Sequence, residues 1–528
     1  MLVSLRRAYA KEPVLTVAAL LLALATVAPF WVGRYLPLLD LPNHLSAITV
    51  WHRYLDPDWD FSRYYTLNLQ PLPYWAHYYF CHQVGKLVGV EIANKIYLTG
   101  YGLALPAGIA ALARRFGRSP WLGLFAFPIV WNTNLAEGFV AFCGGMAALV
   151  WGLYLVDVHA EKPRWSTGFL VFFTGIALYT FHLLAYAGFL LSAGLLCFGQ
   201  RQPFDWKRLL QRGVPVVAGS AIGIWTYLHQ VEYGFQKLEG KRFLVEDPMQ
   251  NKLAIMPTRF LDFLSNQRDE WVVVVLVAAW LLLALTRARA RGDVSDEPQG
   301  ARRYGLELCL AGIGLLFVVL PRTMQRPFYW YMINQRYVPL LFVLAVLTLR
   351  GPIVGGRRWI LAPVIAAGIF YGADVGRAII GFNHRVAGFD SVVAQIPWHK
   401  STLTLSLRPL GDPDFNVNPY NQWPSYTQMR RGGYNFYNFN QGFPLKYRSM
   451  KPAPAWDHAE SFSYEWHGSA WDYFLTHNES TSVMSTGRSF EGKPQVDLFS
   501  DLVRDGKVKL VAAEGPWRLY ENLVPGAR

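Results

Sequence analysis

Long apolar runs separated by short basic loops dominate the chain up to about residue 376. A helix needs roughly 17–25 apolar residues to cross a bilayer, and about eleven segments can be assigned as spans by length and composition. They are Pro13–Val32, Ile92–Ala113, Pro120–Asn132, Gly138–Val156, two within Trp165–Phe198, Gly213–His229, Trp271–Leu285, Tyr304–Leu320, Tyr337–Leu349 and Trp359–Val375. The pattern predicts an α-helical polytopic membrane protein.

The segment Trp165–Phe198 is too long for one span. At 1.5 Å per residue it would extend ~50 Å, whereas the hydrocarbon core is ~30 Å thick. Basic residues flank it on both sides, with Arg164 before it and Lys207 after it. Basic loops stay on the cytoplasmic side, so the segment must cross an even number of times. We therefore predict a hairpin that turns near His182.

Basic residues also predict the orientation of the chain. Arg6, Arg7 and Lys11 precede the first span, and no clear small-x-small cleavage site follows, so we predict an uncleaved span with a cytoplasmic N-terminus. An odd number of crossings, about eleven, leaves the tail outside. The expected location is the cell (inner) membrane, with the C-terminal region in the periplasm or outside the cell.

A polar, aromatic loop, residues 34–91, follows the first span. We predict two surface helices in it, at about Pro42–Leu55 and Pro73–Val88. Apolar residues recur at helical spacing in the first of them, at Leu45, Ile48, Trp51 and Leu55. This spacing is typical of an amphipathic helix that lies on the membrane interface.

The composition changes at about Arg377, where long apolar runs stop and Asn, Tyr, Trp, Pro and Gly become frequent. About 150 residues are enough for one soluble domain. Within it we predict a helix at Phe389–Ile396 and strands at Ser401–Leu407, Trp471–Leu475, Lys507–Ala512 and Trp517–Glu521. The predicted domains are therefore a membrane-spanning domain, residues 1–376, which includes the loop 34–91, and an external α/β domain, residues 377–528.

Composition supports the membrane class. Of the 528 residues, 52% are hydrophobic and 16% are charged, whereas soluble domains carry nearer a quarter charged residues. The net charge of +14 lies largely in short loops, so it indicates sidedness and not a nucleic-acid partner. The four cysteines are few and mostly in apolar segments, and they predict neither a disulfide framework nor a cysteine metal site.

Ionisable residues that share the external side are the candidates for chemistry. They are Asp40 with His44, Glu137, His182, and Arg322, Arg326 and Arg336. Charged groups near membrane depth are costly and indicate function when several converge. A carboxylate beside arginines fits a phosphate-bearing substrate. Because no Walker loop, nucleotide-binding glycine motif or Ser-His-Asp signature is present, we expect the phosphate to arrive on a membrane lipid.

The order of short motifs resembles the GT-C superfamily of polyprenyl-phosphate-sugar-dependent glycosyltransferases, near the protein O-mannosyltransferase and lipid A aminoarabinose transferase branch. The matching segments are Asp40, Gln70-Pro71-Leu72-Pro73-Tyr74-Trp75, Ala113-Arg114-Arg115-Phe116-Gly117, Glu137, His182 and Arg336-Tyr337-Val338-Pro339-Leu340. The resemblance covers the organisation of roughly residues 1–380. It implies a GT-C-like catalytic domain and transfer of a sugar from a polyprenyl-phosphate donor to a lipid, glycan or protein acceptor.

The resemblance also implies roles for residues. Asp40 would be the general base of an inverting transfer, Glu137 the family's second acid, and His44 would orient Asp40 or the acceptor. Substrate binding is assigned to Arg336, Arg326, Arg322, His182 and Asn43. Family members often have two adjacent acids in the first loop, whereas here Asp40 is followed by Leu41. Many members have Lys at the turn between the fifth and sixth spans, whereas this chain has His182. These departures leave a divalent cation open as cofactor, and no metal ligand is assigned.

Structural alternatives exist for each residue. Asp40 suits the cap of a helix that starts near Pro42, Glu137 suits a solvated loop, and the three arginines suit the membrane interface. Two other functions also compete. A transporter or flippase of a lipid-linked or anionic substrate predicts pseudo-symmetric halves with broken helices, and the halves look unalike. A non-catalytic scaffold predicts no converging acid and arginines.

Overall fold

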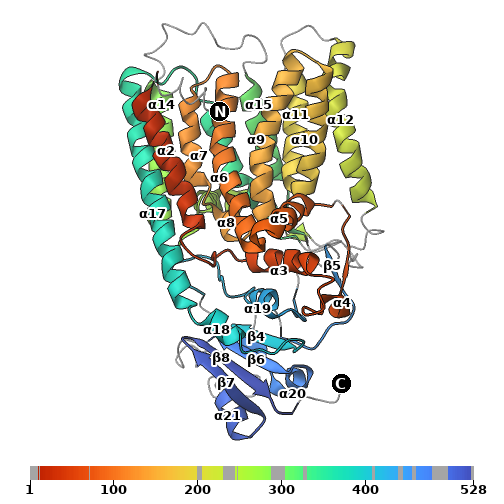
Figure 1. Ribbon diagram of the computed structural model, residues 1–528. Helices are drawn as coiled ribbons and strands as arrows, with labels where there is room; N and C mark the ends of the chain where they lie inside the picture. Colours follow the sequence, from red (N-terminus) through yellow and green to blue (C-terminus); the bar gives the residue numbers. More distant parts are fainter. Residues whose placement is uncertain are drawn as a thin grey trace. The chain divides into compact units, whose positions relative to one another are not determined.

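The computed structural model is mostly helical (Figure 1). It describes residues 10, 12–70, 72–198, 205–229, 244–245, 248–286, 304–324, 330–406, 411–437, 444–454, 459–477 and 498–524. Their contacts divide the chain into two compact units, each built from separate stretches of sequence. The first unit comprises Met1–Val32, Pro71–His77 and Lys95–Gly376, and the second comprises Gly33–Gln70, Tyr78–Asn94 and Arg377–Arg528.

The first unit is a bundle of apolar helices (Figure 1). Its helices are α2 (Pro13–Val27), most of α6 (Val90–Arg115), α7 (Ala126–Ile129), α8 (Thr133–Ala136), α9 (Val140–Glu161), α10 (Trp165–Phe181), α11 (Leu183–Phe198), α12 (Trp206–Leu228), α13 (Met249–Ile255), α14 (Arg268–Leu285), α15 (Gly305–Val319), α16 (Val338–Leu347) and the first part of α17 (Leu361–Arg385). Five 3-10 helices accompany them among the described residues, η1 (Ala28–Phe30), η2 (Pro120–Phe125), η3 (Pro257–Arg259), η6 (Gln335–Tyr337) and η7 (Gly355–Ile360).

Four helical segments in the described part of the chain are long and apolar enough to cross a membrane. They are Pro13–Phe30, Val90–Arg115, Val140–Glu161 and Gly355–Val393. Shorter apolar helices include α10, α11 and α15. The sequence predicted that the last span ends at Val375 and that the apolar runs stop at about Arg377. The helix α17 instead continues to Arg385. The apolar helices support a multi-pass membrane protein.

The predicted break at His182 is present, since α10 ends at Phe181 and α11 begins at Leu183. The two helices pack against each other and both pack against α9. Small residues on α9 allow this close approach: a Cβ added at Gly145 would lie 2.8 Å from the Cβ of Ala185, and one added at Gly152 would lie 2.9 Å from the ring of Phe189.

The predicted third span, Pro120–Asn132, is not one continuous helix. It forms η2 followed by the short α7. Proline and glycine disfavour a continuous helix here, because Pro128 lacks an N–H donor and Gly123 has low helix propensity. Gly123 also packs closely on α6, where an added Cβ would lie 2.8 Å from the carbonyl oxygen of Pro106.

The second unit contains a four-stranded sheet with strand order β4-β6-β8-β7. The strands are β4 (Thr402–Ser406), β6 (Tyr473–His477), β7 (Val508–Glu514) and β8 (Trp517–Asn522), and all four lie where strands were predicted. β4 pairs with β6 in parallel, and the other pairs are antiparallel. Its helices are α18 (Phe389–Val393), α19 (Pro424–Arg431), α20 (Tyr464–His467), α21 (Leu498–Arg504) and the short η8 (Ala459–Ser461) and η9 (Gly468–Ala470).

Most of the loop that follows the first span belongs to this same unit. It supplies α3 (Leu41–His52), α4 (Phe61–Tyr64), β1 (Tyr65–Leu67) and most of α5 (Trp75–Val88). β1 pairs antiparallel with β5 (Leu445–Tyr447), so strands far apart in sequence share a small sheet. Gly432 packs closely against this loop and has φ of 70°. Only glycine fits here, because a Cβ at this position would lie 2.6 Å from the carbonyl oxygen of Trp59.

Helix α3 differs from the expected interfacial helix. Its residues Leu41–Val50 are all buried, polar and apolar alike, and it packs against α19. An interfacial helix needs one polar face in water. The helical period of Leu45, Ile48 and Trp51 was correctly identified, but protein covers this helix, and its polar residues bond to residues of the same unit.

Candidate active site

Glu137 lies in a tight turn between α8 and α9. Asn132 begins the turn by accepting hydrogen bonds through Oδ1 from the backbone N–H groups of Asn134, at 2.8 Å, and Leu135, at 3.4 Å. Glu137 follows the last residue of α8, and Gly138 after it has φ of 81°, a conformation that glycine adopts without steric cost. The chain thereby ends one helix, presents the Glu137 carboxylate and starts α9.

His182 is the extended residue between α10 and α11. Its Nδ1 accepts a hydrogen bond from the backbone N–H of Leu184 at 3.1 Å, which satisfies one of the free N–H groups at the start of α11. Its Nε2 lies 3.0 Å from Nη1 of Arg336 and 3.4 Å from the hydroxyl of Tyr74. The side chain is 1% exposed, so these contacts lie away from solvent.

Arg336 is fixed from several directions. It lies on η6, where its carbonyl accepts a hydrogen bond from the Asn134 side chain at 3.0 Å. Its Nη2 donates to the carbonyl of Tyr331 at 2.9 Å, and its guanidinium carbon lies 3.5 Å from the centroid of the Phe139 ring. The structure therefore brings Arg336 directly against His182 and beside the turn that carries Glu137.

Arg336 and His182 meet through a close contact between two nitrogen atoms. A neutral imidazole has one acceptor nitrogen, yet both Nδ1 and Nε2 of His182 face N–H donors. If Nδ1 accepts from Leu184, Nε2 carries the proton. It then faces the Arg336 guanidinium, which only donates, and the Tyr74 hydroxyl, which can accept. An anionic oxygen that lies beside Nε2 and Nη1, within reach of each, would accept from both groups. Nε of Arg336 also has no hydrogen-bond partner among the described residues.

The electrostatics of Glu137 reflect the same surroundings. Burial raises the pKa of its carboxyl from 4.5 to about 7, while the charges of Arg259 and Arg336 oppose that rise and Asp262 adds to it. The desolvation effect is larger than the attraction of the two arginines. The raised pKa brings Glu137 closer to protonation at neutral pH than a free carboxyl, which suits a residue that exchanges a proton or a charge partner during a reaction.

This raised pKa predicts how stability depends on pH. Between the unfolded pKa of 4.5 and the folded pKa of about 7, the folded chain binds more protons than the unfolded chain, so Glu137 lowers stability as the pH rises. The expected penalty above pH 7 is roughly 3 kcal/mol. Glu137→Gln, which resembles the protonated acid, should have a higher Tm than wild type at pH 8 and a similar Tm at pH 4.5. Thermal melts in detergent measure this, and equal Tm differences at both pH values would contradict it.

Asp40, Asn43 and His44 lie together in the second unit, at the start of α3. Asp40 occupies the N-cap position and Pro42 lies in the first turn, yet the Asp40 side chain makes no capping hydrogen bond. The Asn43 amide donates to Oε1 of Gln422 at 2.9 Å, and Nδ1 of His44 lies 2.7 Å from the hydroxyl of Tyr78. Asn43 and His44 are buried, so both help to fix the helix that begins after Asp40.

Arg322 and Arg326 are the other two arginines that the sequence predicted to bind substrate. Arg322 is half-buried just before β3 (Thr323–Met324), which pairs with β2 (Leu244–Val245), and its carbonyl accepts a hydrogen bond from the backbone N–H of Ile333 at 2.9 Å. Arg326 lies outside the described residues.

Sequence reasoning missed several residues of this site. Arg259 acts on Glu137 electrostatically and pairs with Asp262 at 2.6 Å, and Tyr74 reaches His182. Tyr74 has φ of 75°, a strained conformation that often marks functional sites in non-glycine residues. Asn334 and Gln335 are buried, and their side-chain amides have no hydrogen-bond partner among the described residues. Two sequence features pointed to some of these residues. Prolines precede Tyr74, and Asn334 and Gln335 stand directly before Arg336.

These groups can bind an anion and polar hydroxyls. Arg336 and His182 supply donors in a buried setting, where charge interactions are stronger than in water. The free amides of Asn334 and Gln335 suit hydroxyl groups, because each amide offers both donors and an acceptor. Within the described part of the chain, no group of three or more His, Cys, Asp or Glu side chains is placed to hold a metal ion.

No protein-family model and no curated protein sequence matches the chain. Solved structures that match its fold include the crystal structure of ArnT from Cupriavidus metallidurans in the apo state. The TM-score is 0.52 at 11% identity, over 99% of this chain and 100% of ArnT. The cryo-EM structure of the arabinofuranosyltransferase AftD from Mycobacteria matches with a TM-score of 0.50 at 13% identity, over 98% of this chain and 40% of AftD. The fold that the sequence motifs predicted is thereby confirmed: this chain has the GT-C fold that it shares with ArnT and AftD.

Proposed function

We propose that the chain is an integral-membrane glycosyltransferase that moves a sugar from a polyprenyl-phosphate donor to a lipid, glycan or protein acceptor on the external face of the membrane. The GT-C fold along nearly the whole chain supports this reaction class. The N-terminus is cytoplasmic and the C-terminal region is periplasmic or extracellular in this proposal, as the basic loops predict.

The proposed reaction inverts the anomeric carbon. Asp40 takes the proton from the acceptor hydroxyl or amine, and the acceptor atom forms a bond to the anomeric carbon. The bond between that carbon and the phosphate oxygen breaks, and its electron pair leaves with the polyprenyl phosphate.

The leaving phosphate gains negative charge as its bond to the sugar breaks. Arg336 and His182 are suited to stabilise that charge, because the guanidinium and the imidazole lie side by side and both can donate to an anionic oxygen. Glu137 sets the charge balance around Arg336, and Asn334 and Gln335 are suited to bind sugar hydroxyls. The buried contact between Arg336 and His182 is the observation that carries the proposal.

The test uses the full chain reconstituted in lipid vesicles with undecaprenyl-phosphate donors carrying radiolabelled arabinose, mannose, glucose or aminoarabinose. Cell-envelope lipids and glycans serve as acceptors. We expect one donor to lose its label to an acceptor, with release of undecaprenyl phosphate. Movement of intact donor between leaflets without cleavage of the sugar–phosphate bond would instead establish a flippase. Mass spectrometry of envelope glycans and lipids in a deletion strain then identifies the natural acceptor.

A further inference from the structure

Asp40 lies between two points at which the C-terminal residues of the second unit bind the first loop. One point involves Arg34 and Tyr35, a few residues before Asp40, and the other begins at Asn43, three residues after it. The segment that carries the proposed base is therefore held at both ends by residues beyond 380 in the sequence.

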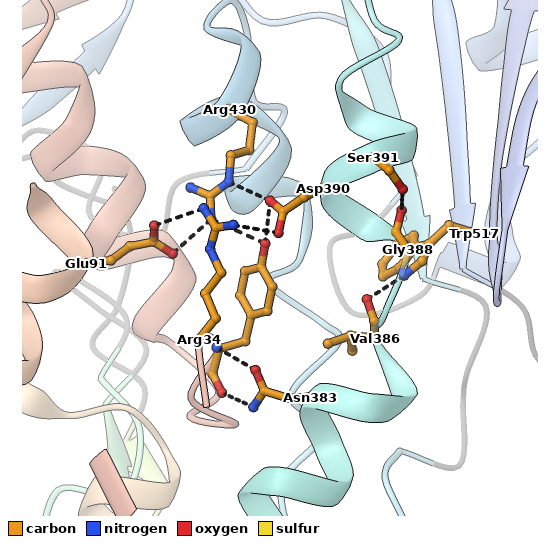
Figure 2. Close-up of polar contacts among 10 residues, drawn as sticks. Arg34, Glu91, Asn383, Val386, Gly388, Asp390, Ser391, Arg430 and Trp517 are labelled. Carbon is orange, nitrogen blue, oxygen red and sulfur yellow. Dashed lines mark hydrogen bonds and ion pairs between the residues drawn. The ribbon is translucent and has the colours of Figure 1, made fainter. Parts of the chain in front are cut away.

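The first point is a hydrogen-bonded network of two arginines and two acids (Figure 2). Nε of Arg430 donates to Asp390 at 2.9 Å, and its Nη2 donates to Glu91 at 2.9 Å. Arg34 donates to Asp390 at 2.8 Å and lies 3.7 Å from Glu91. The four charges balance, and each arginine joins both acids.

Tyr35 connects this network to the backbone of the loop a few residues before Asp40. Its hydroxyl donates to Asp390 at 2.8 Å and accepts from Nη2 of Arg430 at 3.2 Å. Its backbone N–H and carbonyl both bond to the side-chain amide of Asn383, at 2.9 and 2.8 Å (Figure 2). The ring packs against Trp423 and Tyr426, with centroid distances of 5.1 and 4.9 Å, and the residue is 5% exposed.

The second point joins α3 to α19 and the residues just before it. Asn43 donates to Gln422 at 2.9 Å, and Ser46 donates to Oε1 of Gln428. Nε2 of Gln428 donates in turn to the hydroxyl of Tyr65 at 2.7 Å and to the carbonyl of Gly433 at 2.9 Å. All of these side chains are buried, so each lost partner would leave an unsatisfied polar group.

We propose that Arg430 and Gln422 are positioning residues of the transfer reaction, which hold Asp40 in place by fixing the chain on both sides of it. This inference rests on the proposed function, since it assigns Asp40 the role of base. It makes the C-terminal residues a necessary part of the catalytic machinery. A general base must stay within hydrogen-bond reach of the proton it takes, and small displacements are costly.

The neighbouring Arg431 provides a matched control. It lies on the same helix as Arg430, but its guanidinium donates to the carbonyl oxygens of Val393, at 3.0 Å, and Ala394, and it lies over the ring of Trp398. All three partners belong to the C-terminal residues of the unit. Arg431→Gln therefore removes a comparable arginine without releasing the first loop.

The first measurement is hydrogen–deuterium exchange of the full chain in detergent and needs no substrate. In Arg430→Gln, peptides covering residues 34–46 should exchange about tenfold faster than in wild type, because local opening becomes more frequent. In Arg431→Gln these peptides should exchange as in wild type. Equal exchange of the segment in both variants would overturn the inference.

The second measurement is transfer from the radiolabelled undecaprenyl-phosphate sugar that the wild type uses. Arg430→Gln and Gln422→Ala should each lower kcat about 10- to 100-fold with an unchanged KM for the donor, whereas Arg431→Gln should retain wild-type kcat. In an Asp40→Asn background, adding Arg430→Gln should cause no further loss, because its effect acts through Asp40. Full additivity of the two substitutions would refute the positioning role. Full activity of Asp40→Asn alone would refute the proposed base instead, so the two failures are distinguishable.

Discussion

Replacement of Asp40 by Asn is expected to reduce the rate of sugar transfer about 10²- to 10⁴-fold, which is the usual contribution of a positioned general base. The amide keeps the shape of the side chain but does not accept the proton of the acceptor. Folding should be almost unaffected, because the Asp40 side chain makes no capping hydrogen bond and the helix begins with Pro42 in its first turn. The measurement is transfer of label from the lipid donor, together with a thermal melt of the same preparation.

Asp56→Asn is the matched control for this experiment. It makes the same chemical change in the same loop, and Asp56 pairs only loosely with Arg53, at 3.4 Å. We expect Asp56→Asn to transfer at the wild-type rate. If Asp40→Asn also transferred sugar at the wild-type rate, Asp40 would not be the general base. The fold assignment would be unaffected by that result.

Replacement of Arg336 by Gln is expected to lower kcat about 10²- to 10³-fold, because one donor to the developing phosphate charge is removed. Arg336→Lys should recover only part of this loss, since lysine keeps the charge but lacks the planar fork that contacts His182 and Tyr331 together. The measurement is the rate at which undecaprenyl phosphate forms in a single turnover. This rate reports the bond-breaking step and does not depend on product dissociation.

A suitable control for Arg336 is Arg268, which pairs with Asp374 at 2.8 Å and is half exposed. Arg268→Gln should leave the release rate unchanged. If Arg336→Gln altered only the KM for the donor and left kcat intact, the arginine would bind the lipid equally before and during the reaction. The proposed stabilisation of the leaving group would then be wrong.

Features set by local physics were predictable from the sequence. The length of Trp165–Phe198 and its basic flanks were enough to predict the break at His182. Alternating residues near the C-terminus correctly predicted strands β7 and β8. The break in the predicted third span was missed because apolar composition alone was given more weight than Gly123 and Pro128.

Contacts between distant segments were not predictable in the same way. The helical period of α3 indicates an apolar side but does not say whether lipid or protein covers it. Glu137, His182 and Arg336 were named from their motifs, and the structure brings them together in the first unit. Their neighbour Arg259 carries no motif, and Tyr74 lies in a matching segment that gave it no role. Only the folded chain places these two residues beside Glu137 and His182.

The pairing of Tyr35 with Asn383 also has a consequence for biogenesis. These residues are 348 positions apart, so at ~5–20 residues per second the ribosome adds the second partner ~20–70 s after the first. During that interval the nascent loop is already past the first span, and Tyr35, Asn43 and Ser46 lack their permanent hydrogen-bond partners. A ribosome that stalls before residue 383 leaves a membrane-inserted product in which this loop never matures.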